Sequence, residues 1–185
     1  HDAINAQTKK ETDEAIASYN KAIAIKPDFA VAHYNLGNTF KEIGKLDEAV
    51  ASYKKALDIK PDCAEAYHNL GNAHQKTGKV AVAVENFNKA ININPDYVDA
   101  HFNLGVALEE LGEIDEAVAS YRKAIAIEPD YASAYSNLGN ALKQVGKLDV
   151  AVESYNKAIK IRPDLAEAHS NLGLALYGLW KNDEA

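Results

Sequence analysis

The spacing of the chain breakers constrains the fold of this chain more than any other feature of its sequence. The five prolines lie 34 residues apart, and all but one of the ten glycines fall into two further series with the same period. Because proline and glycine mark helix ends and turns, breakers at a fixed spacing indicate a tandem array of one structural unit. A period between about 20 and 50 residues is typical of solenoids and propellers. The prolines are Pro27, Pro61, Pro95, Pro129 and Pro163.

Each period predicts two helices. In residues 64–94, apolar side chains recur at helical spacing in two stretches, one containing Tyr67 and the other containing Phe87. Gly78 separates the stretches and suits the left-handed residue that often follows a helix. Pro95 ends the second stretch, because proline has no N–H to donate and clashes with the preceding turn. Strict alternation of polar and apolar residues does not occur, so we expect no strands.

The residues at fixed offsets carry a family resemblance. In the second complete unit they are Tyr67, Leu70, Gly71, His74, Ala83, Phe87, Ala90 and Pro95, and the other complete units follow the same pattern. This pattern resembles the tetratricopeptide repeat (TPR) and covers nearly the whole chain. The resemblance implies an all-α, right-handed solenoid of antiparallel helix pairs, with first helices lining a concave face and second helices the convex face. We expect one array over residues 1–185: a partial repeat over about 1–29, full repeats at 30–63, 64–97, 98–131 and 132–165, and a truncated repeat at 166–185.

Composition and motifs exclude several classes of function. The formal net charge of −7 argues against nucleic-acid or anionic-membrane partners, which need a positive field. No apolar run approaches the ~18–20 residues of a membrane span. No catalytic constellation, phosphate-binding loop or metal motif occurs, so we expect neither enzymatic activity nor a cofactor. Because the chain starts at His1 and has no methionine, we interpret it as a fragment or processed product, and its compartment stays open with the cytoplasm favoured.

Histidine is the residue type most often used for metal binding or proton transfer. His33, His101 and His169 share one repeat position and lie two repeats apart, too far for one metal ion to join helices that pack ~8–10 Å from their neighbours. His68 and His74 lie six residues apart on one expected helix, which places them on different faces. We therefore expect all five to be core residues rather than metal ligands.

The start of the first helix in the second complete unit offers one further motif. Asp62 precedes Glu65 by three residues, which predicts a capping box. Cys63 follows this aspartate and is the single cysteine, so neither an intrachain disulfide nor a Cys-based zinc site can form. We expect an incidental small residue there rather than a reactive thiol.

An asparagine precedes Leu-Gly in all five first helices, and we expect these side chains to align along the concave groove. A carboxamide offers both donors and an acceptor, so the row could pair with the backbone of an extended peptide whatever its sequence. The row resembles the asparagine ladder that lines the repeats of O-linked N-acetylglucosamine transferases. The alternative is that these residues belong to the general repeat pattern and act locally. The candidates are Asn35, Asn69, Asn103, Asn137 and Asn171, with Asn38, Asn72 and Asn140 one turn further along.

The position before each of these asparagines is graded along the chain. It reads Tyr34, His68 and Phe102 in the first three units, then Ser136 and Ser170. Aromatic residues are common binding anchors, so we add the first three to the peptide-binding candidates. TPR proteins that clamp the acidic tails of heat-shock chaperones carry lysine at this position, and the resemblance therefore implies no such binding here.

We therefore expect a non-catalytic scaffold that binds an extended protein or peptide segment in its concave groove. One alternative is the substrate-recruiting arm of a larger enzyme, such as a glycosyltransferase. A second is a self-assembling array joined through uncapped ends. In the last unit, Trp180 replaces the turn glycine and Gly178 arrives two residues early, so the sequence does not predict the geometry of that turn.

Overall fold

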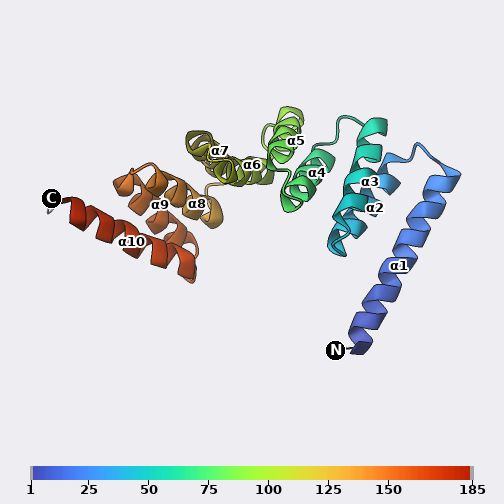
Figure 1. Ribbon diagram of the computed structural model, residues 1–185, viewed down its shortest axis with the longest axis horizontal. Coiled ribbons are helices and arrows are strands. Elements are labelled where there is room, and N and C mark those ends of the chain that lie inside the picture. Colours follow the sequence, from blue (N-terminus) through green and yellow to red (C-terminus); the bar gives the residue numbers. More distant parts are fainter. Residues whose placement is uncertain (1, 184–185) are drawn as a thin grey trace. The chain divides into compact units, whose positions relative to one another are not determined.

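A computed structural model describes the backbone of residues 2–183 and the side chains of residues 9–181. In this part of the chain it contains ten helices and no strand, as the repeat period predicts (Figure 1). The all-α class is therefore confirmed. The helices are α1 (Asp2–Ile25), α2 (Ala30–Glu42), α3 (Leu46–Ile59), α4 (Ala64–Lys76), α5 (Val80–Ile93), α6 (Val98–Glu110), α7 (Ile114–Ile127), α8 (Ala132–Gln144), α9 (Leu148–Ile161) and α10 (Ala166–Asp183).

The helices form two compact units, His1–Pro95 and Asp96–Ala185, which we call the N-terminal and C-terminal units. In the N-terminal unit α2 pairs with α3 and α4 pairs with α5, while α1 packs on α2 and α3 packs on α4. In the C-terminal unit the pairs are α6 with α7 and α8 with α9, and α10 packs on α9. First helices of successive repeats also touch, α2 with α4 and α8 with α10. Stacking of each pair on the next is the arrangement of a solenoid, and a single array over both units stays a prediction.

The breakers act at the helix ends as their chemistry requires. Gly78 follows α4 with a φ of +76°, a left-handed conformation that side chains disfavour, and Gly44, Gly112 and Gly146 adopt the same conformation. At the other end of the pair, Asn94 is extended with a φ of −128°. A residue before proline avoids the helical region because of a clash with the proline ring, so α5 stops just ahead of Pro95.

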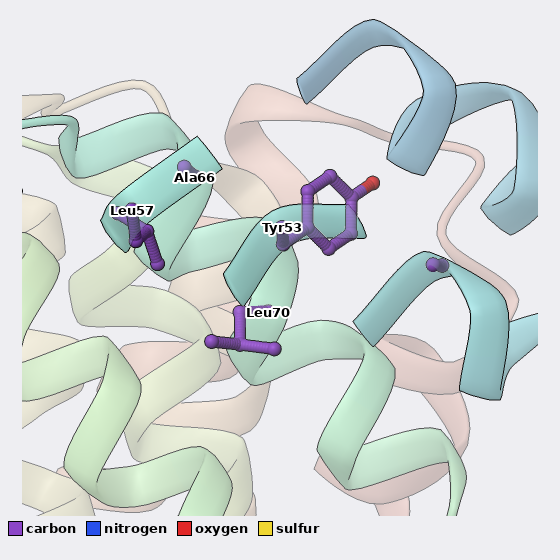
Figure 2. Close-up of a cluster of buried hydrophobic side chains, with 5 residues drawn as sticks. Tyr53, Leu57, Ala66 and Leu70 are labelled. Atoms are coloured by element: carbon purple, nitrogen blue, oxygen red, sulfur yellow. The ribbon is translucent and has the colours of Figure 1, made fainter. Parts of the chain in front are cut away.

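The core of each pair is a ring from the second helix packed on a glycine of the first. Tyr53 of α3 is fully buried and lies so close to Gly37 of α2 that an added Cβ would sit 2.7 Å from its ring. Figure 2 shows Tyr53 and Leu57 with Ala66 and Leu70 of α4, which extend this core towards the next pair. Small residues thus let the helices approach closely, and large residues fill the space between them.

The predicted capping box at the start of α4 is wrong. Cys63, not Asp62, is the N-cap residue, and no side-chain hydrogen bond caps the helix. With the helix starting at Ala64, Glu65 is one position too early for the reciprocal bond that a capping box needs.

The two terminal helices are longer than the helices between them. Helix α1 spans Asp2–Ile25. Helix α10 runs to Asp183, through the position where other first helices end. The reason at α10 is chemical: Trp180 stands where the other units have the glycine with positive φ, so nothing favours a turn there.

Candidate functional site

The asparagine row is joined by hydrogen bonds between the first helices of the N-terminal unit. The Asn69 carboxamide on α4 donates from Nδ2 to the Tyr34 hydroxyl (3.0 Å) and to Asn38 Oδ1 (3.1 Å), both on α2. Lys41 Nζ donates to Asn69 Oδ1 at 3.3 Å. Asn38 Oδ1 also accepts from the Tyr53 hydroxyl at 2.8 Å. In this unit the two asparagine rows therefore form one network that ties the first helix α2 to the first helix α4.

The C-terminal unit repeats this network between α8 and α10. Asn171 Nδ2 donates to Asn140 Oδ1 at 2.9 Å, and Lys143 Nζ donates to Asn171 Oδ1 at 3.5 Å. The Tyr155 hydroxyl donates to Asn140 Oδ1 at 2.8 Å. The same residue types at the same repeat positions thus make the same contacts, which shows that the network belongs to the repeat geometry.

These bonds occupy many of the hydrogen-bond donors and acceptors that a bound peptide would need. A carboxamide has two N–H donors and an oxygen with two lone pairs. Both N–H groups of Asn69 are committed, while its oxygen has accepted one of the two bonds it can take. Asn35 differs, because no hydrogen bond to its side chain is found within the described residues. The first row is half-buried throughout.

The third full repeat departs from the pattern at Glu109, a residue that is not among the candidates from the sequence. Val106 stands where the second asparagine row has its amide, so the Tyr121 hydroxyl lacks that acceptor. Glu109, one turn further along α6, replaces it: its Oε2 accepts from the hydroxyl at 2.8 Å, and its Oε1 accepts from Gln144 Nε2 at 2.6 Å. Burial, reinforced by this carboxylate, raises the pKa of Tyr121 far above its ordinary value. The valine that interrupts the row was the signal that could have identified Glu109.

The aromatic candidates pack against the core rather than standing free. Each ring faces the buried ring on the second helix of the same repeat, with 5.8–5.9 Å between the two centroids. His68 is only 8% exposed, whereas Tyr34 and Phe102 are half-buried. The pairs are Tyr34–Tyr53, His68–Phe87 and Phe102–Tyr121. Of the serines at this position, Ser136 is buried and Ser170 is exposed.

The shared histidine position has a structural use. His33 Nε2 donates to the Pro27 carbonyl at 3.1 Å, and His169 Nε2 donates to the Pro163 carbonyl at 2.9 Å. Each ring thus ties its helix to the proline that precedes it. Among the described residues, no group of three or more His, Cys, Asp or Glu side chains could hold a metal ion.

Cys63 is half-buried, and its thiol lies 3.5 Å from Glu65 Oε2. Burial raises the pKa of this thiol above its ordinary value. Because the thiolate is the nucleophile, a raised pKa lowers the reactivity of the sulfur at neutral pH.

In the described part of the chain, no helix is both long enough and apolar enough to cross a bilayer.

The comparisons with known proteins agree with this geometry. The family model described as TPR repeat matches residues 9–44, 37–78, 76–112, 107–146 and 139–179. A crystal structure of MamA gives a TM-score of 0.81 at 32% identity, over 88% of this chain and 95% of MamA. A crystal structure of YrrB, a TPR protein with an unusual peptide-binding site, gives 0.78 at 27% identity, over 91% of this chain and 87% of YrrB.

No curated protein sequence matches the chain. The resemblance of the asparagine row to O-linked N-acetylglucosamine transferases receives no support from these comparisons and stays a prediction. The repeat matches extend without a gap from residue 9 to residue 179, and the turns and core contacts of that segment are those the repeat requires. The chain belongs to the tetratricopeptide repeat family.

Proposed function

We propose that the chain is a protein-interaction scaffold that holds an extended peptide segment of a partner along the first helices of each unit. The observation that carries the proposal is the chain of hydrogen bonds through the asparagine rows, Asn38 to Asn69 in one unit and Asn140 to Asn171 in the other. These hydrogen bonds hold half-buried polar groups in fixed positions along each row. A surface whose side chains are already ordered loses less entropy on binding, which favours affinity.

The available hydrogen-bonding capacity indicates how a peptide backbone would be held. Asn69 Oδ1 can accept one further bond, from a peptide N–H. The half-buried Asn35 carboxamide offers the same kinds of group, N–H donors for a peptide carbonyl and an oxygen acceptor for a peptide N–H. Contacts to backbone amides carry no sequence preference, so selectivity would come from neighbouring side chains.

The similarity to YrrB supports a peptide as the partner class. YrrB is described as a TPR protein with an unusual peptide-binding site and shares 27% of its residues with this chain in the aligned region. The match covers most of both chains, so a peptide site in this chain is consistent with the shared architecture.

Binding to a panel of unrelated, unstructured peptides tests the proposal. We expect Asn35→Ala to weaken binding about fivefold, the value of one hydrogen bond of about 1 kcal/mol, without changing thermal stability. Asn69→Ala should lower both binding and stability, because it also breaks the bonds to Asn38 and Tyr34. Asn88→Ala, on the exposed surface of α5, is the matched control and should change neither. Unchanged affinity of Asn35→Ala for every peptide would refute the proposed groove.

A second candidate is self-association, favoured by apolar side chains exposed on α10. Leu176 and Trp180 are 48% and 52% exposed, although Leu142, at the position of Leu176 in the preceding repeat, is fully buried. Light scattering at increasing protein concentration tests this candidate. An apparent mass that rises with concentration in the native chain, and stays constant in Leu176→Glu, would support it; a constant mass in both would exclude it.

A further inference from the structure

The second full repeat differs from its neighbours at two buried positions that lie on one groove. His74 of α4 occupies a position that is apolar in the other repeats, and Asn86 of α5 occupies one that is otherwise serine. Both side chains are buried, with 4% and 5% exposure. The corresponding residues are Phe40, Leu108, Leu142 and Leu176 for the histidine, and Ser52, Ser120 and Ser154 for the asparagine. The buried polar ring of His74 is therefore a property of this groove and not of the repeat, and Asn86 places a larger polar group there than the serine of the other repeats.

The groove lies within the N-terminal unit, between α3, α4 and α5, and has a volume of about 550 Å³. That volume is in the range of sites for small organic ligands. Tyr67, Leu70 and His74 reach it from one face of α4, at helical spacings of three and four residues, whereas Asn69 lies on another face. The groove is thus separate from the asparagine network. Its apolar lining includes Leu57 and Val82.

His74 has an unsatisfied polar atom. Its Nδ1 is buried and has no hydrogen-bond partner among the described residues. A buried polar atom without a partner is rare in folded proteins and destabilises them by about 1–3 kcal/mol. A leucine at this position, as in three other repeats, would avoid that cost. The ring is therefore expected to have a partner that comes from outside the chain.

The charges around the ring indicate the sign of that partner. Lys54 of α3, Lys79 of the turn before α5 and Lys89 of α5 line the groove, together with the carboxylates of Asp58 and Glu85. Lys89 lies over the Tyr67 ring, 5.5 Å from its centroid. The other two lysines, Lys54 and Lys79, make no ion pair within the described part of the chain. Burial, and then these two ammonium groups, hold the pKa of His74 below its ordinary value, so the ring is neutral near pH 7.

We propose that this groove binds a ligand with a carboxylate head on an apolar body. The ammonium groups of Lys54 and Lys79 pair with the carboxylate, the His74 imidazole supplies a hydrogen bond to it, and Leu57, Leu70 and Val82 contact the apolar body. A carboxylate suits the site better than a cation, because three lysines line the groove against two carboxylates, and Lys54 and Lys79 make no ion pair among the described residues. The ligand is either a free carboxylic acid or an acidic side chain between apolar residues of a peptide.

Titration of the intact chain with sodium hexanoate, followed by the NMR signals of the histidine rings, tests the proposal. We expect a saturable shift of the His74 signals, and a much smaller effect of the neutral analogue hexan-1-ol. Lys79→Ala should weaken hexanoate binding about fivefold, the effect of one partly exposed ion pair of about 1 kcal/mol. The matched control is Lys147→Ala, at the same turn position in a repeat that has Leu142 instead of His74. It should leave the affinity unchanged.

His74→Leu lacks the ring that reports binding, so its affinity for hexanoate is measured by titration calorimetry beside the native chain. The variant should bind hexanoate more weakly and still fold, because the preceding and following repeats show that an apolar residue fits this position. A capped tripeptide with one glutamate between two leucines distinguishes the two sources of the carboxylate. If it binds more tightly than hexanoate, the natural ligand is a peptide; the reverse order assigns a free acid. The absence of a saturable shift with both probes would overturn the proposal, as would equal weakening by the two lysine variants.

Discussion

Replacing Gly139 by alanine tests whether close approach of glycine to a buried ring holds each repeat together. The new Cβ would lie 2.6, 2.8 and 2.9 Å from three carbons of the Tyr155 ring, against an ordinary carbon–carbon contact of about 3.5–4.0 Å. The ring cannot easily move, because Tyr155 is fully buried and its hydroxyl is bonded to Asn140 Oδ1. Overpacking of this kind costs about 1–3 kcal/mol.

The same substitution also has a favourable effect, which a second glycine isolates. Alanine is better than glycine inside a helix by about 1 kcal/mol. At Gly173 of α10 an added Cβ meets no atom within 4 Å among the described residues, so only this favourable effect acts. We therefore expect Gly173→Ala to raise the free energy of unfolding by up to about 1 kcal/mol. Gly139→Ala should lower it by about 1–2 kcal/mol, because contacts as short as 2.6 Å put the clash at the upper end of the overpacking range, about 2–3 kcal/mol, from which the gain in helix propensity is subtracted.

Urea denaturation followed by circular dichroism measures both values. Because the two changes are chemically identical and lie at the same repeat position, any difference in sign reports the surroundings and not the residue. If Gly139→Ala were as stable as the native chain, the argument from ring packing would be refuted. Destabilisation of equal size in both variants would refute it too, since no ring lies over Gly173.

Three further predictions follow from individual side chains. Tyr121→Phe should destabilise the chain by about 1–2 kcal/mol in urea, because it leaves the half-buried Glu109 carboxylate without one donor. The pKa of His74 is lowered in the folded state, so we expect stability to fall as pH drops below about 6.5, where the unfolded chain takes up this proton first; His74→Leu should flatten thermal stability across that range. Burial, and then Glu109, raise the pKa of Tyr155 to about 12. Stability should therefore fall as pH rises above about 10, and an ultraviolet titration in which every phenol ionised near 10 would contradict the burial.

The sequence predicts the repeat because its strongest signals are local. The positive φ at Gly78 and the end of α5 before Pro95 follow from the conformational limits of those residues alone. Burial of Phe87 against Gly71 also follows, since the two positions recur as a large and a small residue in every complete repeat. Features of this kind depend on a residue and its near neighbours in the chain, so they can be predicted without coordinates.

The candidate site depends on distances between helices, and there the sequence is a weaker guide. The sequence places Asn69 in a row, but it does not reveal that both N–H groups are already bonded to Tyr34 and Asn38. Residue type alone makes the aromatic side chains candidates for binding, yet their rings pack on the second helices because the helices are close enough for the rings to meet. The role of Glu109 depends on the reach of a side chain across one helical turn, which repeat position alone does not give.

The solenoid explains how single repeats can acquire their own chemistry. Each helix pair contacts its neighbours in its unit and little else, so a substitution changes one groove and leaves the other pairs as they were. Val106 and Glu109 show this directly: the third repeat loses an amide and gains a carboxylate, while Asn140 and Tyr155 in the next repeat keep the usual bond. His74 and Asn86 are likewise changes within one repeat, and they line a groove on a different face from the asparagine rows. Binding chemistry that is specific to one repeat is therefore best sought where that repeat departs from the others, because the shared positions serve both to hold the repeats together and, as proposed, to contact a peptide backbone whatever its sequence.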